Sequence, residues 1–276
     1  MNLRRFPFYR ERLDRAKPAP WTLTDLEAFA AVHPKDPYAG RVIRKSPSEV
    51  SLQLEATGEP PVWVALNAAE LSRWARVVAR MWSRWGVAAG ETIAFFEYGS
   101  SPLVLLASSG YVGYLRRGAA EIRGLSAICN DGVATMAPRM VSIVEQVRPS
   151  MLIIRRELAS PFLTAIESSS VAMKGIVRWV GLTEVEGVPP AAEAERLSSA
   201  LGVPVHRIFR ADAAFMLAGE CPKCRAFHVD REYQASATDN GEVAITAKFA
   251  ETCPVVNYSI GSARLVQGGC AIEPEA

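Results

Sequence analysis

The clearest pattern of hydrophobic and polar positions predicts a helix from about Ala68 to Trp85. The apolar residues that recur there every three or four positions are Leu71, Trp74, Val78, Met81 and Trp85. This spacing places them on one face of the helix, so the helix must pack against other elements. Asn67 can cap its start together with Glu70, and Gly86 follows its end, as is typical of helix boundaries.

Short apolar runs rich in β-branched and aromatic residues predict buried strands at Thr92–Phe96, Met151–Ile154 and Ile176–Val180. Helical patterns alternate with them, at Met140–Val147 and Ala191–Leu201. Because strands and helices alternate, we predict an α/β layered core over residues 1–220.

The character of the chain changes after about Cys221. Gly241–Thr246 and Val255–Tyr258 have strand-like composition, glycine and proline become frequent, and the helical periodicity disappears. We therefore predict a small β-rich subdomain over residues 221–276.

The composition excludes several classes of protein. With 276 residues and 49% hydrophobic residues, the chain can bury a sizeable core, so disorder is excluded as its dominant state. The 31 basic and 29 acidic residues leave a net charge of +2 without a basic run, so we expect no nucleic-acid partner.

The first twenty residues lack the apolar centre of a secretory signal, so we expect a cytoplasmic location. The uncharged stretch Ser100–Leu115 is too short and too polar for a membrane span, and it predicts a buried strand and a turn.

Several segments, in chain order, resemble adenylate-forming enzymes (the ANL superfamily) of the phenylacetate-CoA and benzoate-CoA ligase type. They are FPFYRERLDRA, TLTDLEAF, the long segment PPVWVALNAAELSRWARVVARMWSRWGVAAGETI, FFEYGSSPLVL, GECPKCRAFHVDREY, NGEVAIT and CPVVNYSIGSARLVQGGC. The resemblance covers nearly the whole chain. It implies the mixed sheets and flanking helices of that family's N-terminal domain, followed by a small β-rich part.

The chain departs from the family at the loop that holds the ATP phosphates. The family has small and hydroxyl-bearing residues there, whose backbone N–H groups surround the phosphates. The aligned stretch Gln53–Pro60 has Glu55 in place of a glycine and Glu59 in place of a lysine. Because two carboxylates would repel a triphosphate, we expect neither ATP nor magnesium to bind.

Two further nucleotide motifs of the family are altered. In the strand-end motif that packs beside adenine and serves magnesium, Arg210 replaces a glycine and Ala213 a glutamate, while Asp212 is one residue out of register. Ser262 replaces the ribose-binding aspartate, and a serine cannot give the charged contact to both ribose hydroxyls. The resemblance also predicts a C-terminal domain with a catalytic lysine, which we expect this chain to lack after Ala276.

These departures predict a degenerate, non-adenylating relative of aryl- and acyl-CoA ligases. We expect it to bind a small acyl or aromatic ligand, or to support a partner enzyme or a second copy of itself. The alternative is an active ligase, or an acyl-transfer enzyme that uses an already activated thioester or a partner subunit. Fold alone does not decide between them.

A cluster of cysteine and histidine has the spacing of a zinc site. Cys221, Cys224 and His228 form C-x2-C-x3-H, and Cys270 is the favoured fourth ligand, with Cys253 as its substitute. Some members of the resembled family carry a structural metal in this region, and four protein ligands would make a structural site here. The alternatives are free thiols beside a buried histidine, and a redox C-x-x-C pair.

The resemblance places the acyl pocket beside four residues, which are Tyr98, Gly99, Ser108 and Tyr111. The alternative is that they only fill the core. The paired arginines Arg116–Arg117 and Arg155–Arg156 are expected to be solvated or to lie at helix ends. No catalytic residue is assigned, because His33 and His206 lack a neighbouring nucleophile motif.

Overall fold

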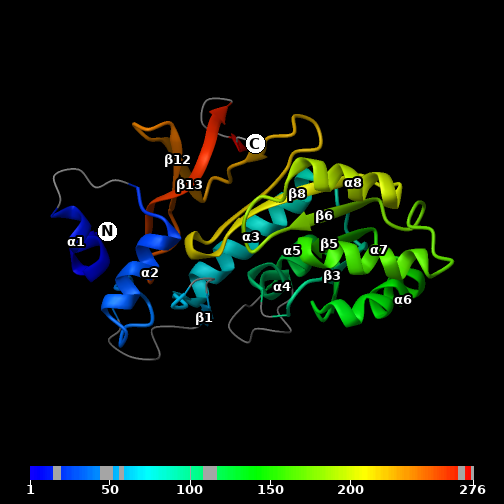
Figure 1. Ribbon diagram of the computed structural model, residues 1–276, viewed down its shortest axis with the longest axis horizontal. Coiled ribbons are helices and arrows are strands. Elements are labelled where there is room, and N and C mark those ends of the chain that lie inside the picture. The colour runs from blue at the N-terminus through cyan, green and yellow to red at the C-terminus, as the bar shows by residue number, and fades with distance from the viewer. Residues whose placement is uncertain are drawn as a thin grey trace. The chain divides into compact units, whose positions relative to one another are not determined.

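The computed structural model describes residues 1–14, 20–43, 52–55, 59–99, 101–107, 117–266 and 271–274; of residues 52–55 and of Ser262 it describes the backbone alone. The chain divides into two compact units (Figure 1). One comprises Met1–Trp74, Ala211–Met216 and His228–Glu275, and the other comprises Ala75–Arg210 and Leu217–Phe227.

The second unit is built on a sheet of seven strands. In spatial order these are β4 (Ser126–Asn130), β3 (Thr92–Phe96), β5 (Met151–Arg155), β6 (Trp179–Thr183), β8 (Val205–Ala211) and β7 (Glu186–Gly187), with β9 (Met216–Gly219) also paired to β8. The first five run parallel to their neighbours, with Phe96 opposite both Asn130 and Ile154. All five residues of β5 are buried. Burial on both faces of the sheet explains why the sequence of such a parallel strand is mainly apolar.

Helices cover both faces of this sheet. Helices α5 (Ala119–Arg123), α6 (Ala137–Val147), α7 (Ala159–Glu167) and α8 (Ala191–Leu201) belong to this unit. Met140 of α6, Phe162 of α7 and Leu197 of α8 share one core cluster with Phe96 and Ile154, so these three helices lie on one face (Figure 1). On the other face the Trp82 ring of α3 (Ala68–Arg84) lies 6.2 Å from the Phe95 ring.

The predicted boundaries of α3 are confirmed to within one residue. The Asn67 side chain accepts hydrogen bonds from the backbone N–H groups of Ala69 and Glu70 at 2.9 and 3.0 Å, and the Glu70 carboxylate accepts one from the Asn67 N–H. At the other end Gly86 has a φ of +73°, the left-handed conformation that ends helices.

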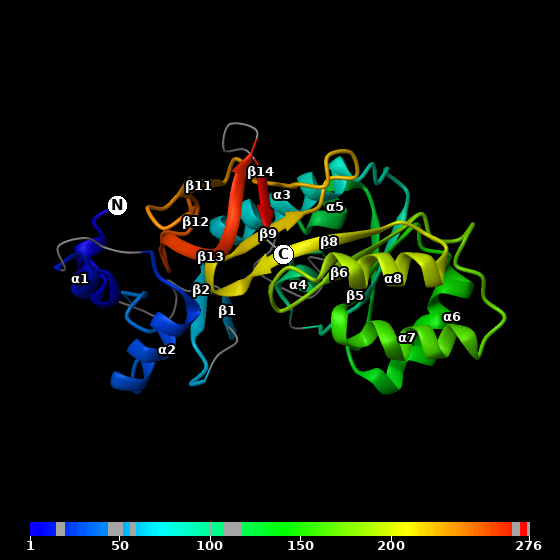
Figure 2. The same ribbon diagram turned by 45° about the horizontal axis from the view of Figure 1, so that its top comes forward.

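The first unit contains an antiparallel sheet. Its order is β10 (Phe227–His228), β14 (Ala271–Pro274), β13 (Val255–Val266), β12 (Glu242–Ala247) and β11 (Tyr233–Ala237), and Figure 2 shows β12, β13 and β14 side by side. A hairpin of β1 (Leu52–Glu55) and β2 (Trp63–Leu66) belongs to the same unit, as do helices α1 (Pro7–Leu13) and α2 (Leu23–Val32). The Tyr9 hydroxyl of α1 donates to the Pro254 carbonyl at 2.8 Å, which ties the start of the chain to β13.

The strand predicted within Ser100–Leu115 is wrong where the structure describes it. Pro102–Ala107 is a buried helix, α4. An apolar run of this length does not distinguish a buried strand from a buried helix. Pro102 opens the helix, where its missing N–H costs nothing, and the Ser101 hydroxyl accepts from the Val104 N–H at 3.4 Å. No helix in the described part of the chain is long and apolar enough to cross a membrane.

Candidate functional site

Polar side chains gather where the parallel strands of the second unit end. Glu97 directly follows β3, Arg155 ends β5, and Arg210 lies one residue before the end of β8. The chain goes from β3 outward to β4 and then back to β5 on the other side, so the strand order reverses between β3 and β5. In open α/β sheets, ligands bind at the carboxyl edge at such a reversal. Glu97 and Arg155 occupy that position.

A buried network of ion pairs, which we call the edge cluster, joins Glu97, Arg155 and Arg210. The Glu97 carboxylate lies 3.8 Å from the Arg155 guanidinium and 3.4 Å from that of Arg210. The three residues are at most 3% exposed. Strands β5 and β6 separate β3 from β8, a distance of about 14 Å at normal strand spacing. The Arg210–Glu97 pair therefore bridges the carboxyl ends of β5 and β6.

Arg155 links this network to an accessible aromatic ring. Its guanidinium carbon lies 3.5 Å from the centroid of the Tyr98 ring, and Tyr98 is 44% exposed. The Arg155 guanidinium also donates to the Gly132 carbonyl at 3.2 Å and to the Glu157 carboxylate. Its buried Nε atom has no hydrogen-bond partner among the described residues. A buried N–H of this kind can donate to a carboxylate or carbonyl oxygen of a ligand.

Two glycines near the Tyr98 backbone differ in the space that a side chain would have. A Cβ atom on Gly132 would lie 2.4 Å from the Tyr98 nitrogen, so only glycine allows this approach. A Cβ atom on Gly99 would meet no described atom within 4 Å.

Near the edge cluster, burial and the charges of Asp131 and Glu97 raise the pKa of Cys129 to about 11, so this residue stays a neutral thiol. Of the four predicted pocket residues, the structure places Tyr98 and Gly99 at the edge cluster, whereas Ser108 and Tyr111 lie outside the described residues.

Of the two alternatives expected for Arg155, a solvated side chain and a helix-end position, only the first is wrong, because Arg155 directly precedes the short 3-10 helix Arg156–Leu158. Arg155 is 2% exposed, whereas Arg156 is half-exposed and pairs with Glu184 and Glu193 at the surface. The edge cluster is not apparent from the sequence, because Glu97, Arg155 and Arg210 lie far apart along the chain. A usable signal was present, since Glu97 and Arg155 each directly follow four apolar strand residues, and parallel strands bring such positions to one edge.

The structure brings Cys221, Cys224 and His228 together. Their ligand atoms lie within 4.8 Å of one another on one turn of the chain. Burial opposes ionisation of the Cys221 thiol, but hydrogen bonds from the backbone of Cys224 and Lys223 and from the Cys224 side chain outweigh it and lower the pKa of Cys221. Cys253 is fully buried and is not part of this group, and Cys270 lies outside the described residues. Three of the four zinc ligands favoured by sequence are thus adjacent.

Comparisons with protein-family models and with curated proteins find no match. Among solved structures, a 2-hydroxyisobutyryl-CoA ligase in complex with 2-HIB-AMP and CoA superposes with a TM-score of 0.76 at 15% identity, over 98% of this chain and 64% of that one. An acyl-CoA synthetase of Brucella canis gives a TM-score of 0.54 at 15% identity, over 85% and 46% of the two chains. The anthranilate-CoA ligase AuaEII with anthranoyl-AMP gives 0.52 at 14% identity, over 76% and 41%.

The chain has the fold of adenylate-forming CoA ligases. The predicted α/β class with layered sheets and a small β-rich part is confirmed. The chain spans 62–64% of the length of the 2-hydroxyisobutyryl-CoA ligase structures.

Proposed function

We propose that this chain is a non-adenylating relative of acyl- and aryl-CoA ligases that binds a small acyl or aromatic carboxylate at the edge cluster. The observation that carries the proposal is the buried Arg210–Glu97 bridge at the carboxyl edge of the sheet. By the resemblance, Arg210 stands where the ligases have the glycine beside adenine. A guanidinium held there by a buried carboxylate occupies space that a nucleotide would need.

The remaining part of the cluster suits a small carboxylate. The unpartnered Nε of Arg155 offers a charge-assisted hydrogen bond, and the half-exposed Tyr98 ring offers an aromatic surface beside it. Such a ligand needs neither a phosphate loop nor magnesium. The proposal therefore agrees with the carboxylates of Glu55 and Glu59, which the sequence places on the phosphate-loop stretch.

ATP–pyrophosphate exchange with magnesium and a panel of aryl and acyl acids tests the proposal. We expect exchange to stay at background, while benzoate or isobutyrate raises the melting temperature, because a ligand that binds only the native state stabilises it. Tyr98→Ala should weaken carboxylate binding about fivefold, through loss of the ring contact, while Tyr98→Phe, which keeps the ring, should bind normally. Exchange above background would instead support an active ligase, and no stabilisation by any acid would contradict a carboxylate site.

We further propose a structural zinc ion on Cys221, Cys224 and His228, with Cys270 as the fourth ligand. Zinc–sulfur bonds of about 2.3 Å bring tetrahedral ligand atoms about 3.7 Å apart, so the group needs only a small contraction. The hydrogen bonds from backbone N–H groups to the Cys221 sulfur favour the thiolate that zinc requires. A four-ligand site of this kind fixes the turn and leaves no open position for a substrate.

Metal analysis of the purified protein is expected to find about one zinc ion per chain. Cys224→Ser should lose most of the metal and lower the melting temperature, because removal of one thiolate weakens the site and metal binding contributes directly to folding. Cys129→Ser is the matched control, since Cys129 is a neutral thiol on strand β4, and it should keep the metal. Equal metal content in both variants and the unaltered protein would contradict the site.

A further inference from the structure

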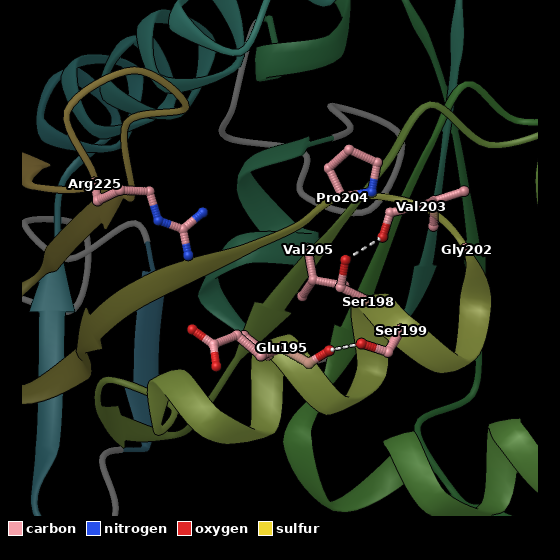
Figure 3. Close-up of a pocket in the computed structure, with 9 residues that line it drawn as sticks. Glu195, Ser198, Ser199, Gly202, Val203, Pro204, Val205 and Arg225 are labelled. Carbon is pink, nitrogen blue, oxygen red and sulfur yellow. Dashed lines mark hydrogen bonds between the residues drawn. The ribbon is translucent and has the colours of Figure 1, made fainter.

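A pocket lies at the amino edge of the parallel sheet, opposite the edge cluster. Its volume is about 490 Å³, within the range of small-molecule sites. Helix α8 forms one wall with Glu195, Ser198 and Ser199, and the start of β8 forms another with Val205 (Figure 3). Arg225, next to Cys224 in the chain, extends into the pocket from a third side. None of these residues belongs to the edge cluster.

The helix wall of the pocket favours a positively charged group. The Ser198 hydroxyl donates to the Val203 carbonyl at 2.8 Å and the Ser199 hydroxyl to the Glu195 carbonyl at 2.9 Å, so both oxygens present lone pairs to a ligand. These serines lie in the last turns of α8, where the helix dipole is negative. Within the described part of the chain, the Glu195 carboxylate has no hydrogen-bond or ion-pair partner.

Arg225 supplies the opposite charge in a fixed position. The left-handed conformation of its backbone, with a φ of +62°, is held by a 3.0 Å hydrogen bond from its N–H to the Cys221 carbonyl. Its Nε atom lies 3.1 Å from the fully buried Glu220 carboxylate. This pairing orients the guanidinium and leaves its two terminal nitrogens to donate to a ligand.

The two charged groups do not neutralise each other. Figure 3 shows the Arg225 guanidinium and the Glu195 carboxylate extending from opposite walls of the pocket toward each other. No ion pair within 4.0 Å joins these two described residues, and the Nε atom of Arg225 pairs with Glu220. A molecule that carries both an ammonium and a carboxylate would complete both contacts at once, whereas an ion with a single charge would complete one.

We propose that this pocket binds a small zwitterion of the amino-acid type. The ammonium group lies against Glu195 and the carboxyl end of α8, and the carboxylate accepts from the terminal nitrogens of Arg225. Val205 and Pro204 contribute apolar surface for a short side chain. The site is independent of the edge cluster and of the function proposed for it.

Calorimetric titration with L-alanine, and with its two halves ethylammonium and propionate, tests this proposal. L-alanine should bind at least about tenfold more tightly than either half, because it engages both charges. L-glutamine, which has a larger side chain, should bind at least about tenfold more tightly than the same two ions. Binding of propionate alone at equal strength would reduce the site to a simple anion contact and overturn the proposal, as would the absence of binding by both amino acids.

Matched variants locate the binding. Glu195→Gln and Arg225→Gln should each weaken amino-acid binding about fivefold or more, since each removes one charge contact. Glu145→Gln and Arg139→Gln, on the exposed face of α6, change the same charges elsewhere and should have no effect. Glu195→Gln should also leave the thermal response to benzoate unchanged, which separates this site from the edge cluster. Equal affinity in Glu195→Gln and Glu145→Gln would overturn the proposal.

Discussion

Replacement of Glu97 by glutamine is expected to lower the free energy of unfolding by about 3–5 kcal/mol, the cost of removing one partner from a buried ion pair. Glutamine keeps the volume of the side chain and removes its charge. The Glu97 carboxylate faces the guanidinium groups of both Arg155 and Arg210. Because these guanidinium groups are buried, water cannot solvate their charges when the carboxylate is lost. Urea unfolding at neutral pH, followed by circular dichroism, measures the change.

The matched control for this prediction is Glu145→Gln on helix α6, where the side chain is exposed. Its effect should stay within about 0.5 kcal/mol, as for most surface substitutions. A loss below about 1 kcal/mol for Glu97→Gln would mean that the edge cluster is hydrated in solution. In that case Arg210 would not obstruct the carboxyl edge, and the main support for a non-adenylating function would disappear.

The parts of the fold that the sequence predicted are those in which local chemistry and packing agree. Helix α3 has an amphipathic stripe, a capping pair at its start and a glycine after its end, and all of them point to the same element. The first four residues of strand β5, Met151–Ile154, are a continuous apolar run because helices cover both faces of its sheet. Neither feature depends on knowing which distant segments are neighbours.

Predictions failed where neighbours in space decide the structure. Pro102–Ala107 is apolar throughout, so its periodicity carries no information and the buried surroundings determine that it is helical. The burial of Arg155 could not be predicted, because the sequence does not reveal that strand order brings this residue beside Glu97. Tyr98 was found through a family resemblance, whereas its stacking on Arg155 is a tertiary contact that no short motif encodes.

Gly132→Ala is expected to destabilise the protein by about 2–4 kcal/mol, through steric overlap at the edge cluster. The new Cβ atom would lie 2.4 Å from the Tyr98 nitrogen and 2.5 Å from the Glu97 carbonyl carbon, both rigid backbone atoms. The loop after β4 must move away, which also removes the hydrogen bond from Arg155 to the Gly132 carbonyl. Calorimetry should record a melting temperature lower by about 4–16 °C, at roughly 2–4 °C per kcal/mol for a chain of this size.

Gly99→Ala is the control in the same site. No described atom lies within 4 Å of the position of its Cβ, and its φ is not in the left-handed region, so alanine fits without strain. The substitution also reduces the entropy of the unfolded chain, so its effect should lie between neutral and about 1 kcal/mol of stabilisation. If Gly132→Ala and Gly99→Ala had equal effects, the loop after β4 would not touch the Tyr98 backbone. Arg155 would then lose the contact that orients it, and the carboxylate site proposed there would have no fixed donor.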